Sequence, residues 1–404
     1  MAVVLGYPIV SDAKEMFRLF EVQGRDAWGS RIVAVDDGYL IVGGRVDRLT
    51  SLQAGLVIRT DHEGNRQFMR TIGDEMANSV FSTGKEIGKK DFILAGYAKA
   101  IRKPEFQAGS FTASEGWVVS VSSAGPTKWI RRLQWTEAVE YESETVSIRP
   151  PVFISDLDIN RNGDIILVGH IRYGVSDQPV LWKLRSDGKL LWKRRLRIGD
   201  EAESVVPDRI RFRSSGGLLF SGTVIGRKQS SSWISGVVCS LNDSGNVLWK
   251  KRVDCSSRSV VEELPNGNIV AAMLQGHANK AKLHMMMLTG RREVIWERDV
   301  PLAGACGLDH LSSSDNERVI VAGSTCQDER ERIWVIEVTK AGDLYSVEKH
   351  LRNTDVHVGQ VITEGDHVFA TGSRNKGNAA VWLYRDELHH AKVGGKWEQH
   401  WIRE

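Results

Sequence analysis

Tyr39-Leu-Ile-Val-Gly43 is the stretch that decides the fold, because similar runs recur along the whole chain. Each run is rich in aliphatic or β-branched residues and ends in a small residue. The other six are Phe92-Ile-Leu-Ala-Gly96, Ile165-Ile-Leu-Val-Gly169, Leu218-Leu-Phe-Ser-Gly222, Asn268-Ile-Val-Ala-Ala272, Val319-Ile-Val-Ala-Gly323 and His367-Val-Phe-Ala-Thr-Gly372. Their final residues are 53, 73, 53, 50, 51 and 49 positions apart. A period of about 50 residues is typical of four-stranded propeller blades.

Turn signals place each run second among four strands. Several runs follow a tight turn such as Asn162-Gly163, so an antiparallel strand should precede them. An alternating run such as Val180-Leu-Trp-Lys-Leu184 should form the third strand. A turn glycine four residues before an aromatic, as in Gly188 and Trp192, should begin the fourth. We name these strands A to D, with the repeated run as strand B.

The tryptophans fit this arrangement. The chain has 13 of them, and period-2 strands offer inward positions where a large ring packs against the neighbouring blade. A row of exposed stacking platforms for bases or sugars is the alternative, which the period disfavours. We expect five tryptophans to be structural: Trp182, Trp192, Trp249, Trp296 and Trp334.

One repeat carries a family resemblance. Leu241-Asn-Asp-Ser-Gly-Asn-Val-Leu-Trp249 resembles the degenerate Asp-x-x-Gly-x-x-x-Trp repeat of quinoprotein-like and WD-like β-propellers. The resemblance covers nearly the whole chain. It implies an all-β fold, with residues 1–404 as a single propeller domain of seven four-stranded blades. Such motifs specify turns and packing, so the resemblance implies no particular chemistry.

The ring needs one strand to close it. Within residues 1–22, Glu15-Met-Phe-Arg-Leu-Phe20 has the pattern of a D strand that precedes the first A strand. Lys396-Trp-Glu-Gln-His-Trp401 near the C-terminus could fill the same place. We expect the N-terminal strand to complete the last blade.

Composition excludes several classes of protein. Hydrophobic residues make up 41% of the chain, and 54 basic against 51 acidic residues leave a net charge of +3. This balance gives no global attraction to nucleic acid or to an anionic membrane. No apolar run approaches the roughly 20 residues of a spanning helix, and the first residues lack a secretory signal pattern. The sequence therefore predicts a cytoplasmic protein with no membrane partner.

The four cysteines are spread without metal-ligand spacing, and we expect reduced thiols and no cofactor. One loop, with Asp158, Asn160, Asn162 and Asp164, spaces oxygen atoms as calcium loops do. Amides replace two of the carboxylates, and no downstream acidic residue follows in register. An Asn-Gly hairpin turn is the preferred interpretation, so no metal is expected.

Insertions mark one face of the expected ring. Residues 97–115 and 134–151 lengthen the B–C and D–A connections of blade 2, which emerge on the same face. Binding residues concentrate on loops that a rigid scaffold holds, so the sequence predicts a non-enzymatic scaffold with a protein partner docked there. The residues expected to contact this partner are Arg102, Lys103, Phe106, Phe111, Glu140 and Glu142.

The main alternative is an enzyme or small-ligand receptor at the mouth of the central channel. No catalytic motif is present, but A strands could bring distant residues together there. These are Arg31, Asp156, Asp208, Arg209, Asp309, His310 and Gln360. Asp309 could orient His310 as a general base, but adjacent strand residues point to opposite faces.

Two observations separate these alternatives. A deep polar pocket with converging titratable groups would identify an enzyme, whereas exposed anchors such as Phe106 and Phe111 would identify a scaffold. A nucleic-acid-associated scaffold is a third hypothesis. It is less favoured because acidic loops share the face with the basic ones and would repel phosphates.

Overall fold

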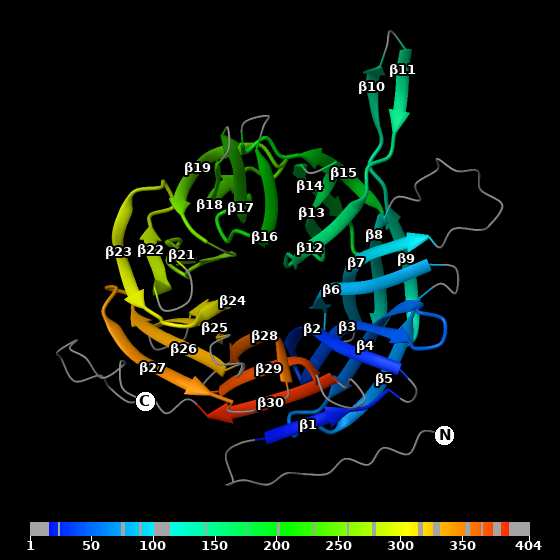
Figure 1. Cartoon of the computed structure of the whole chain (residues 1–404), viewed down its shortest axis with the longest axis horizontal. Coiled ribbons are helices and arrows are strands. Elements are labelled where there is room, and N and C mark those ends of the chain that lie inside the picture. Colours follow the sequence, from blue (N-terminus) through cyan, green and yellow to red (C-terminus); the bar gives the residue numbers. More distant parts are fainter. Residues whose placement is uncertain are drawn as a thin grey trace.

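Period-2 strands and glycine turns build a closed ring of antiparallel sheets around a central channel, as Figure 1 shows. The computed structural model describes residues 16–22, 25–73, 77–88, 91–100, 114–141, 144–174, 176–199, 203–228, 231–256, 258–276, 280–313, 318–325, 332–351, 356–364, 367–374 and 381–387. The prediction of an all-β propeller with seven four-stranded blades is confirmed.

Each blade is a meander whose A strand lies innermost and whose D strand lies outermost. Blade 1 is β2 (Arg25–Val35), β3 (Gly38–Asp47), β4 (Gln53–Thr60) and β5 (Arg66–Ile72). Blade 2 is β6 (Ala77–Ile87), β7 (Asp91–Ala100), β8 (Ser114–Ser122) and β9 (Thr127–Leu133). Blade 3 is β12 (Val152–Ile159), β13 (Ile165–Tyr173), β14 (Ser176–Leu184) and β15 (Leu190–Arg195). Blades 4 and 5 are β16 (Ser204–Phe212), β17 (Leu218–Lys228), β18 (Ser231–Leu241) and β19 (Val247–Asp254); and β20 (Ser259–Glu263), β21 (Ile269–Gln275), β22 (Lys282–Leu288) and β23 (Val294–Pro301). Blade 6 is β24 (Ala305–Ser313), β25 (Arg318–Thr325), β26 (Arg332–Thr339) and β27 (Leu344–His350), and blade 7 is β28 (Val356–Glu364), β29 (His367–Arg374), β30 (Val381–Glu387) and β1 (Met16–Phe20).

The N-terminal strand completes blade 7. β1 pairs antiparallel with β30, with Phe17 opposite Tyr384. The Phe17 ring also stacks on Trp382, with 5.8 Å between ring centroids. The predicted closure is therefore confirmed, and residues 396–401 lie outside the described residues.

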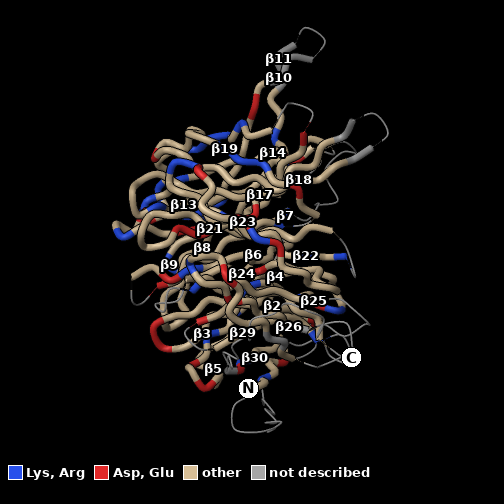
Figure 2. The backbone as a smooth tube through the Cα atoms, turned by 90° about the vertical axis from the view of Figure 1, so that its left-hand side faces the viewer, with Lys and Arg blue, Asp and Glu red and all other residues tan. Residues whose placement is uncertain are grey.

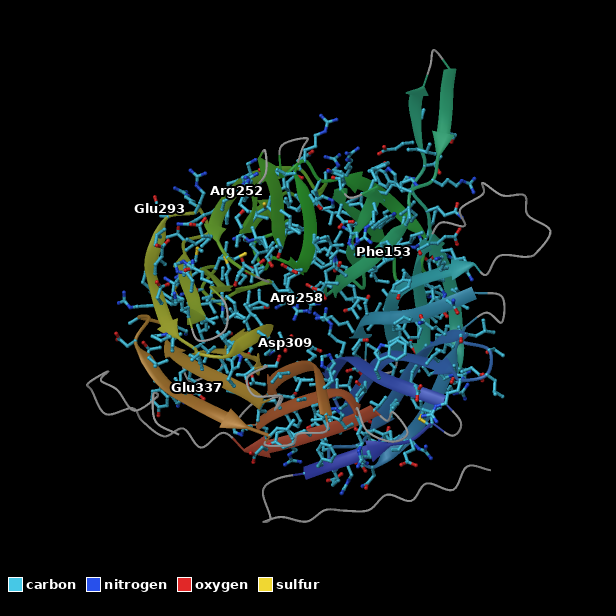
Figure 3. The ribbon with its side chains drawn as sticks, viewed as in Figure 1. Phe153, Arg252, Arg258, Glu293, Asp309 and Glu337 are labelled. Carbon is cyan, nitrogen blue, oxygen red and sulfur yellow. The ribbon has the colours of Figure 1, made fainter. Side chains whose placement is uncertain are left out.

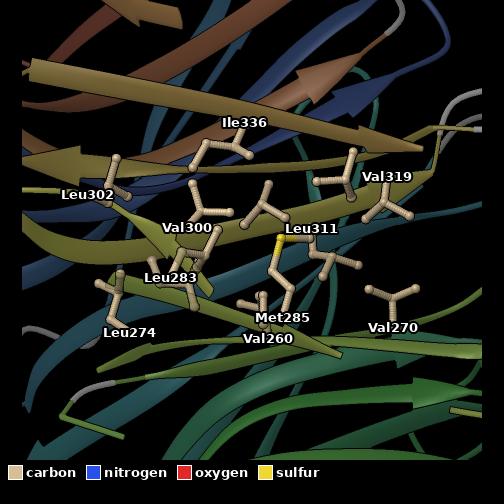
Figure 4. Close-up of a cluster of buried hydrophobic side chains, with 14 of the residues drawn as sticks. Val260, Val270, Leu274, Leu283, Met285, Val300, Leu302, Leu311, Val319 and Ile336 are labelled. Atoms are coloured by element: carbon tan, nitrogen blue, oxygen red, sulfur yellow. The ribbon is translucent and has the colours of Figure 1, made fainter. Parts of the chain in front are cut away.

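The core lies between neighbouring blades. The B strands are buried along most of their length, and six successive residues of β21 from Ile269 are buried. Figure 4 shows one such core between blades 5 and 6, where Val260 and Met285 face Leu311 and Ile336. In contrast, the outermost β19 alternates between half-buried and exposed residues. Facing sheets thus bury the inner strands from both sides, as close packing of sheets requires.

The repeated glycines and tryptophans meet between blades. Gly188 adopts a φ of +79°, which the C–D turn of blade 3 requires. A Cβ atom on Gly188 would lie 2.9 Å from the Trp129 ring of blade 2. Trp182 and Trp334 are 1% and 0% exposed, and Trp296 is also buried. Trp192 and Trp249 pack partly buried against neighbouring clusters, so all five tryptophans have the expected structural role.

Two strands stand outside the ring. β10 (Glu137–Tyr141) and β11 (Glu144–Ile148) pair as a hairpin within residues 134–151, and this hairpin projects away from the blades (Figure 1). Most of the other insertion, residues 101–113, lies outside the described residues.

Cys306 is disulfide-bonded, so the expectation of reduced thiols was wrong for this residue. Cys306 is exposed and lies at a bulge of β24.

Charged residues of both signs are interspersed along the side of the ring (Figure 2). Within the part of the chain that the structure describes, there is no helix with the length and apolarity needed to cross a membrane.

Candidate functional site

β-Bulges build the channel lining. Six of the seven described A strands shift register at an equivalent place, and each bulge leaves one residue without a pairing partner on strand B. A bulge re-aims the side chain beside it, which is why bulges are common near active sites. The six bulged residues all line the same cavity: Ser30, Ser82, Ser155, Asp208, Asp309 and Gly359.

This channel cavity has a volume of about 620 Å³ and lies where the A strands begin and the B strands end. The B–C and D–A loops emerge at that end of the ring. Figure 3 shows Arg258 and Asp309 beside the central opening and Phe153 across from them. The volume lies within the range of small-molecule sites. The cavity therefore combines charged groups with an aromatic side.

Asp156 forms an ionic centre behind the cavity, and it is 2% exposed. Its Oδ1 accepts a hydrogen bond from Arg31 of blade 1 at 3.1 Å. Its Oδ2 accepts bonds from Arg211 at 2.7 Å and from the backbone N–H of Ile210 at 3.1 Å, both in blade 4. The Thr83 hydroxyl of blade 2 adds a bond of 3.3 Å. One buried carboxylate therefore connects four blades.

Asp208 lines the cavity in blade 4. Its Oδ2 accepts hydrogen bonds from the Thr223 hydroxyl at 2.9 Å and from the backbone N–H of Ser259 at 3.0 Å. Among the described residues, no hydrogen bond reaches its Oδ1. Burial raises the pKa of Asp208, although these hydrogen bonds and the charge of Arg258 oppose the rise. The carboxyl group is thus held firmly while one oxygen stays available to a ligand.

The structure separates Asp309 from His310. Asp309 lines the cavity, and its backbone carbonyl accepts a hydrogen bond from Arg209, whereas His310 lies behind it. Burial lowers the pKa of His310 to about 3, and the charges of Arg211 and Arg31 add to the effect. His310 therefore stays neutral, and the two residues do not form a catalytic pair facing the cavity.

Five of the seven residues expected at the channel line the cavity. They are Arg31, Asp208, Arg209, Asp309 and Gln360. Gln360 serves partly as a structural link, because its Oε1 accepts a hydrogen bond of 2.8 Å from the backbone of Ile32. Asp156 and His310 belong to the layer behind the cavity.

Sequence reasoning missed the aromatic side of the cavity, which comes from blades 2 and 3. We call Tyr97, Phe153, His170 and Arg172 the His170 wall. The Phe153 ring stacks on His170 at 5.1 Å, and Tyr97 meets its edge at 5.3 Å between centroids. The Arg172 guanidinium lies 5.3 Å from the same ring. Tyr97 and His170 each directly follow the small residue that ends a B run, so aligning the repeats at that residue could have found them.

The His170 wall pairs a proton acceptor with a proton donor. Burial lowers the pKa of His170, and Arg172 adds to this while Asp177 opposes it. Burial also raises the pKa of Tyr97. At neutral pH the imidazole is therefore unprotonated and the phenol is protonated, which are the states needed for a general base and a general acid.

Asp177 orients the cationic part of this wall. Its Oδ1 accepts a hydrogen bond of 2.8 Å from Arg172 Nε, and its Oδ2 accepts one of 3.3 Å from Nη2. Arg172 Nη1 makes no hydrogen bond to the described residues. His170 Nε2 lies 3.7 Å from the same carboxylate, close enough to stabilise an imidazolium that forms when the ring takes a proton.

The loop considered for calcium forms the hairpin turn. Asn160 Oδ1 accepts hydrogen bonds from the backbone N–H groups of Asn162 at 3.0 Å and Asp164 at 2.8 Å. Asp158 instead contacts Lys85 and accepts a bond of 2.7 Å from the backbone of Phe212. The four residues therefore do not converge, and the described residues contain no group of three or more metal-ligating side chains.

The residues expected to bind a protein partner lie beyond what the structure describes. Arg102, Lys103, Phe106, Phe111 and Glu142 fall outside the described residues. Glu140 lies in β10, but only its backbone is described. Their proposed contacts stay a prediction.

No protein-family model matches the chain, and no curated protein matches it. Solved structures do resemble it. A polysaccharide lyase, Uly1, aligns with a TM-score of 0.55 and 8% identity over 89% of this chain and 90% of its own. A PL25 ulvan lyase bound to -[GlcA(1-4)Rha3S]- aligns with a TM-score of 0.56 and 9% identity over 92% and 96%. A protein of unknown function from Dyadobacter fermentans aligns with a TM-score of 0.50 and 12% identity over 94% and 99%.

These identities show a shared fold. The similar propellers nevertheless include enzymes, and the channel of this chain holds a polar pocket with titratable groups, which is the feature expected of an enzyme. The prediction of a non-enzymatic scaffold was therefore wrong, because loop lengths alone do not show where titratable side chains converge. The findings favour the alternative prediction, an enzyme or small-ligand receptor with its site at the mouth of the central channel. The chain shares its propeller fold with polysaccharide lyases.

Proposed function

We propose that the protein is an enzyme that cleaves an acidic polysaccharide by β-elimination in the channel cavity. The observation that carries this proposal is the His170 wall, which brings an imidazole, a phenol and a guanidinium around one aromatic ring. The similar propellers named as polysaccharide lyases, one of them with a glucuronate-containing ligand, support the choice of substrate class.

Each step of the elimination has a residue suited to it. Arg172 Nη1 binds the carboxylate of a uronate unit, which makes the hydrogen on the neighbouring carbon more acidic. His170 removes that proton, and the electron pair of the broken C–H bond forms a carbon–carbon double bond. The adjacent C–O bond of the glycosidic link breaks, and Tyr97 gives its proton to the departing oxygen. The products are an unsaturated uronate end and a new hydroxyl end, and water returns the proton from His170 to Tyr97.

The surroundings favour this division of roles. Asp177 stabilises the imidazolium after proton transfer and holds Arg172 through two hydrogen bonds. Phe153 keeps the three groups in fixed positions through its ring contacts. Holding reacting groups in place in this way contributes strongly to rate.

The test measures the unsaturated product by ultraviolet absorbance, with uronate-containing polysaccharides such as ulvan and a neutral polysaccharide as substrates. His170→Gln and Tyr97→Phe should each lower kcat by roughly 10²- to 10⁴-fold, as expected for loss of a general base or acid. The matched controls His284→Gln and Tyr345→Phe lie outside the cavity lining and should keep full activity. Wild-type protein that forms no unsaturated product from any uronate, or His170→Gln protein with full activity, would overturn the proposal.

A further inference from the structure

Four arginines line the channel cavity, and three of them have protein partners. Arg31 bonds to Asp156, Arg172 bonds to Asp177, and Arg209 bonds to the carbonyl of Asp309. Arg258 is exposed, and among the described residues it makes no hydrogen bond or ion pair. The cavity therefore presents one guanidinium with all its donors available.

Arg258 faces the axis of the channel. It precedes β20 and lies beside the central opening, across from Phe153 (Figure 3). Its charge acts on two cavity groups from other blades: it favours the ionised form of Asp208 in blade 4 and disfavours the charged form of Arg31 in blade 1. A side chain that influences residues on both neighbouring and opposite blades points inward.

Arg258 and Asp208 complement each other as ligand-binding groups. A free guanidinium presents five N–H donors and suits the oxygens of a carboxylate or sulfate. The Asp208 carboxyl is fixed through Oδ2, and its Oδ1 can accept a hydrogen bond from a sugar hydroxyl. Arg258 lies across the central opening from Phe153 (Figure 3), and Asp208 lines the same cavity from blade 4, next to the blade that carries His170. A volume of about 620 Å³ can hold a ligand larger than one sugar ring.

We propose that Arg258 and Asp208 form a second sugar subsite, in which Arg258 binds an anionic substituent on the unit next to the one held at the His170 wall. This inference rests on the proposed function for the identity of the ligand as an acidic polysaccharide. The subsite selects chains that carry negative charge on neighbouring units. The anionic group on the bound sugar unit is a sulfate ester or a second carboxylate. Both groups present oxygen atoms that arginine recognises.

The experiment measures binding by titration calorimetry. The probe is an ulvan oligosaccharide with the repeat -[GlcA(1-4)Rha3S]-, used as such, after removal of its sulfate, and after reduction of its carboxylates. Each form is titrated into wild type, Arg258→Gln and the control Arg66→Gln, which removes an exposed arginine of the outer strand β5. Arg258 is exposed, so its replacement should leave the fold intact.

Arg258→Gln should weaken binding of the intact oligosaccharide on the order of 10- to 100-fold, the usual effect of losing a charge-assisted hydrogen bond. If the bound group is sulfate, the desulfated form should bind both proteins equally. If it is a carboxylate, the carboxyl-reduced form should bind both equally. Arg66→Gln should bind like wild type.

The subsite would be overturned by Arg258→Gln protein that binds every form like wild type, or by wild type that binds none of them. Failure of the proposed function has a different signature. Arg258-dependent binding without formation of unsaturated product would leave the subsite standing and reject β-elimination.

Discussion

Arg31 and Asp156 lie 125 positions apart in the chain, yet their side chains meet at 3.1 Å behind the channel cavity. The contact joins the innermost strands of blades 1 and 3. Both residues directly follow β-bulges, which turn their side chains toward the centre of the ring. The ionic layer behind the site is therefore a product of the bulges and of ring closure together.

Replacing Asp156 should destabilise the ring. Asp156→Asn removes the charge that balances Arg31 and Arg211, and breaking a buried pair costs about 3–5 kcal/mol. Urea unfolding measures the free energy of unfolding. The control Asp26→Asn breaks an exposed pair with Arg48 and should cost less than about 1 kcal/mol. Equal losses in the two variants would contradict the role of Asp156.

Replacing Gly188 tests the packing between blades. Gly188→Ala should cost more than the roughly 1–3 kcal/mol of backbone strain, because its Cβ would also press on Trp129. Gly267→Ala is the matched control, since Gly267 has a similar φ of +82° and no atom within 4 Å of the position that a Cβ would take. Thermal unfolding of both variants gives the comparison. A Gly267→Ala variant that is destabilised as much as Gly188→Ala would show that strain alone matters.

His310 should make the fold sensitive to acid. Its pKa falls from 6.5 to about 3 in the folded protein, so below pH 6.5 only the unfolded chain takes up the proton. This contribution to stability is complete above pH 6.5 and is lost as the pH falls toward 3. In His310→Gln, the free energy of unfolding should therefore decline less steeply between these pH values. Identical slopes for wild type and variant would count against a buried neutral His310.

Activity should survive into mildly acidic solution. His170 must be unprotonated to act as a base, and burial lowers its pKa from 6.5. The acidic limb of the kcat/KM profile should therefore have its midpoint below pH 6.5. Asp177→Asn removes the carboxylate that opposes this shift, so the midpoint should move to still lower pH. A wild-type midpoint at or above 6.5 would contradict the assignment of His170.

The repeats predicted most of the architecture because the patterns that form a blade are local. Alternating strands, the turn glycine Gly188 and the buried Trp182 all act on residues within one blade or the next. The closing strand was also predictable, because residues 15–20 carry the pattern of a D strand without an A strand before it.

The site was only partly predictable. Arg31, Asp208 and Asp309 were found because A strands must lie innermost in a propeller. Tyr97, His170 and Thr223 each follow the glycine that ends a B run, so they occupy equivalent positions in their blades. Tyr97 and His170 face the cavity, whereas Thr223 bonds to Asp208, and nothing in the local sequence indicates this difference.

The sequence by itself determined a seven-bladed ring closed by its N-terminal strand, since hydrophobic period and turn chemistry are properties of neighbouring residues. Only the tertiary structure decided that Tyr97, Phe153, His170 and Arg172 converge and that Arg258 stays without a protein partner among the described residues. Those relationships depend on strand register, on the bulges and on the angle between blades, which arise when residues far apart in the chain pack together.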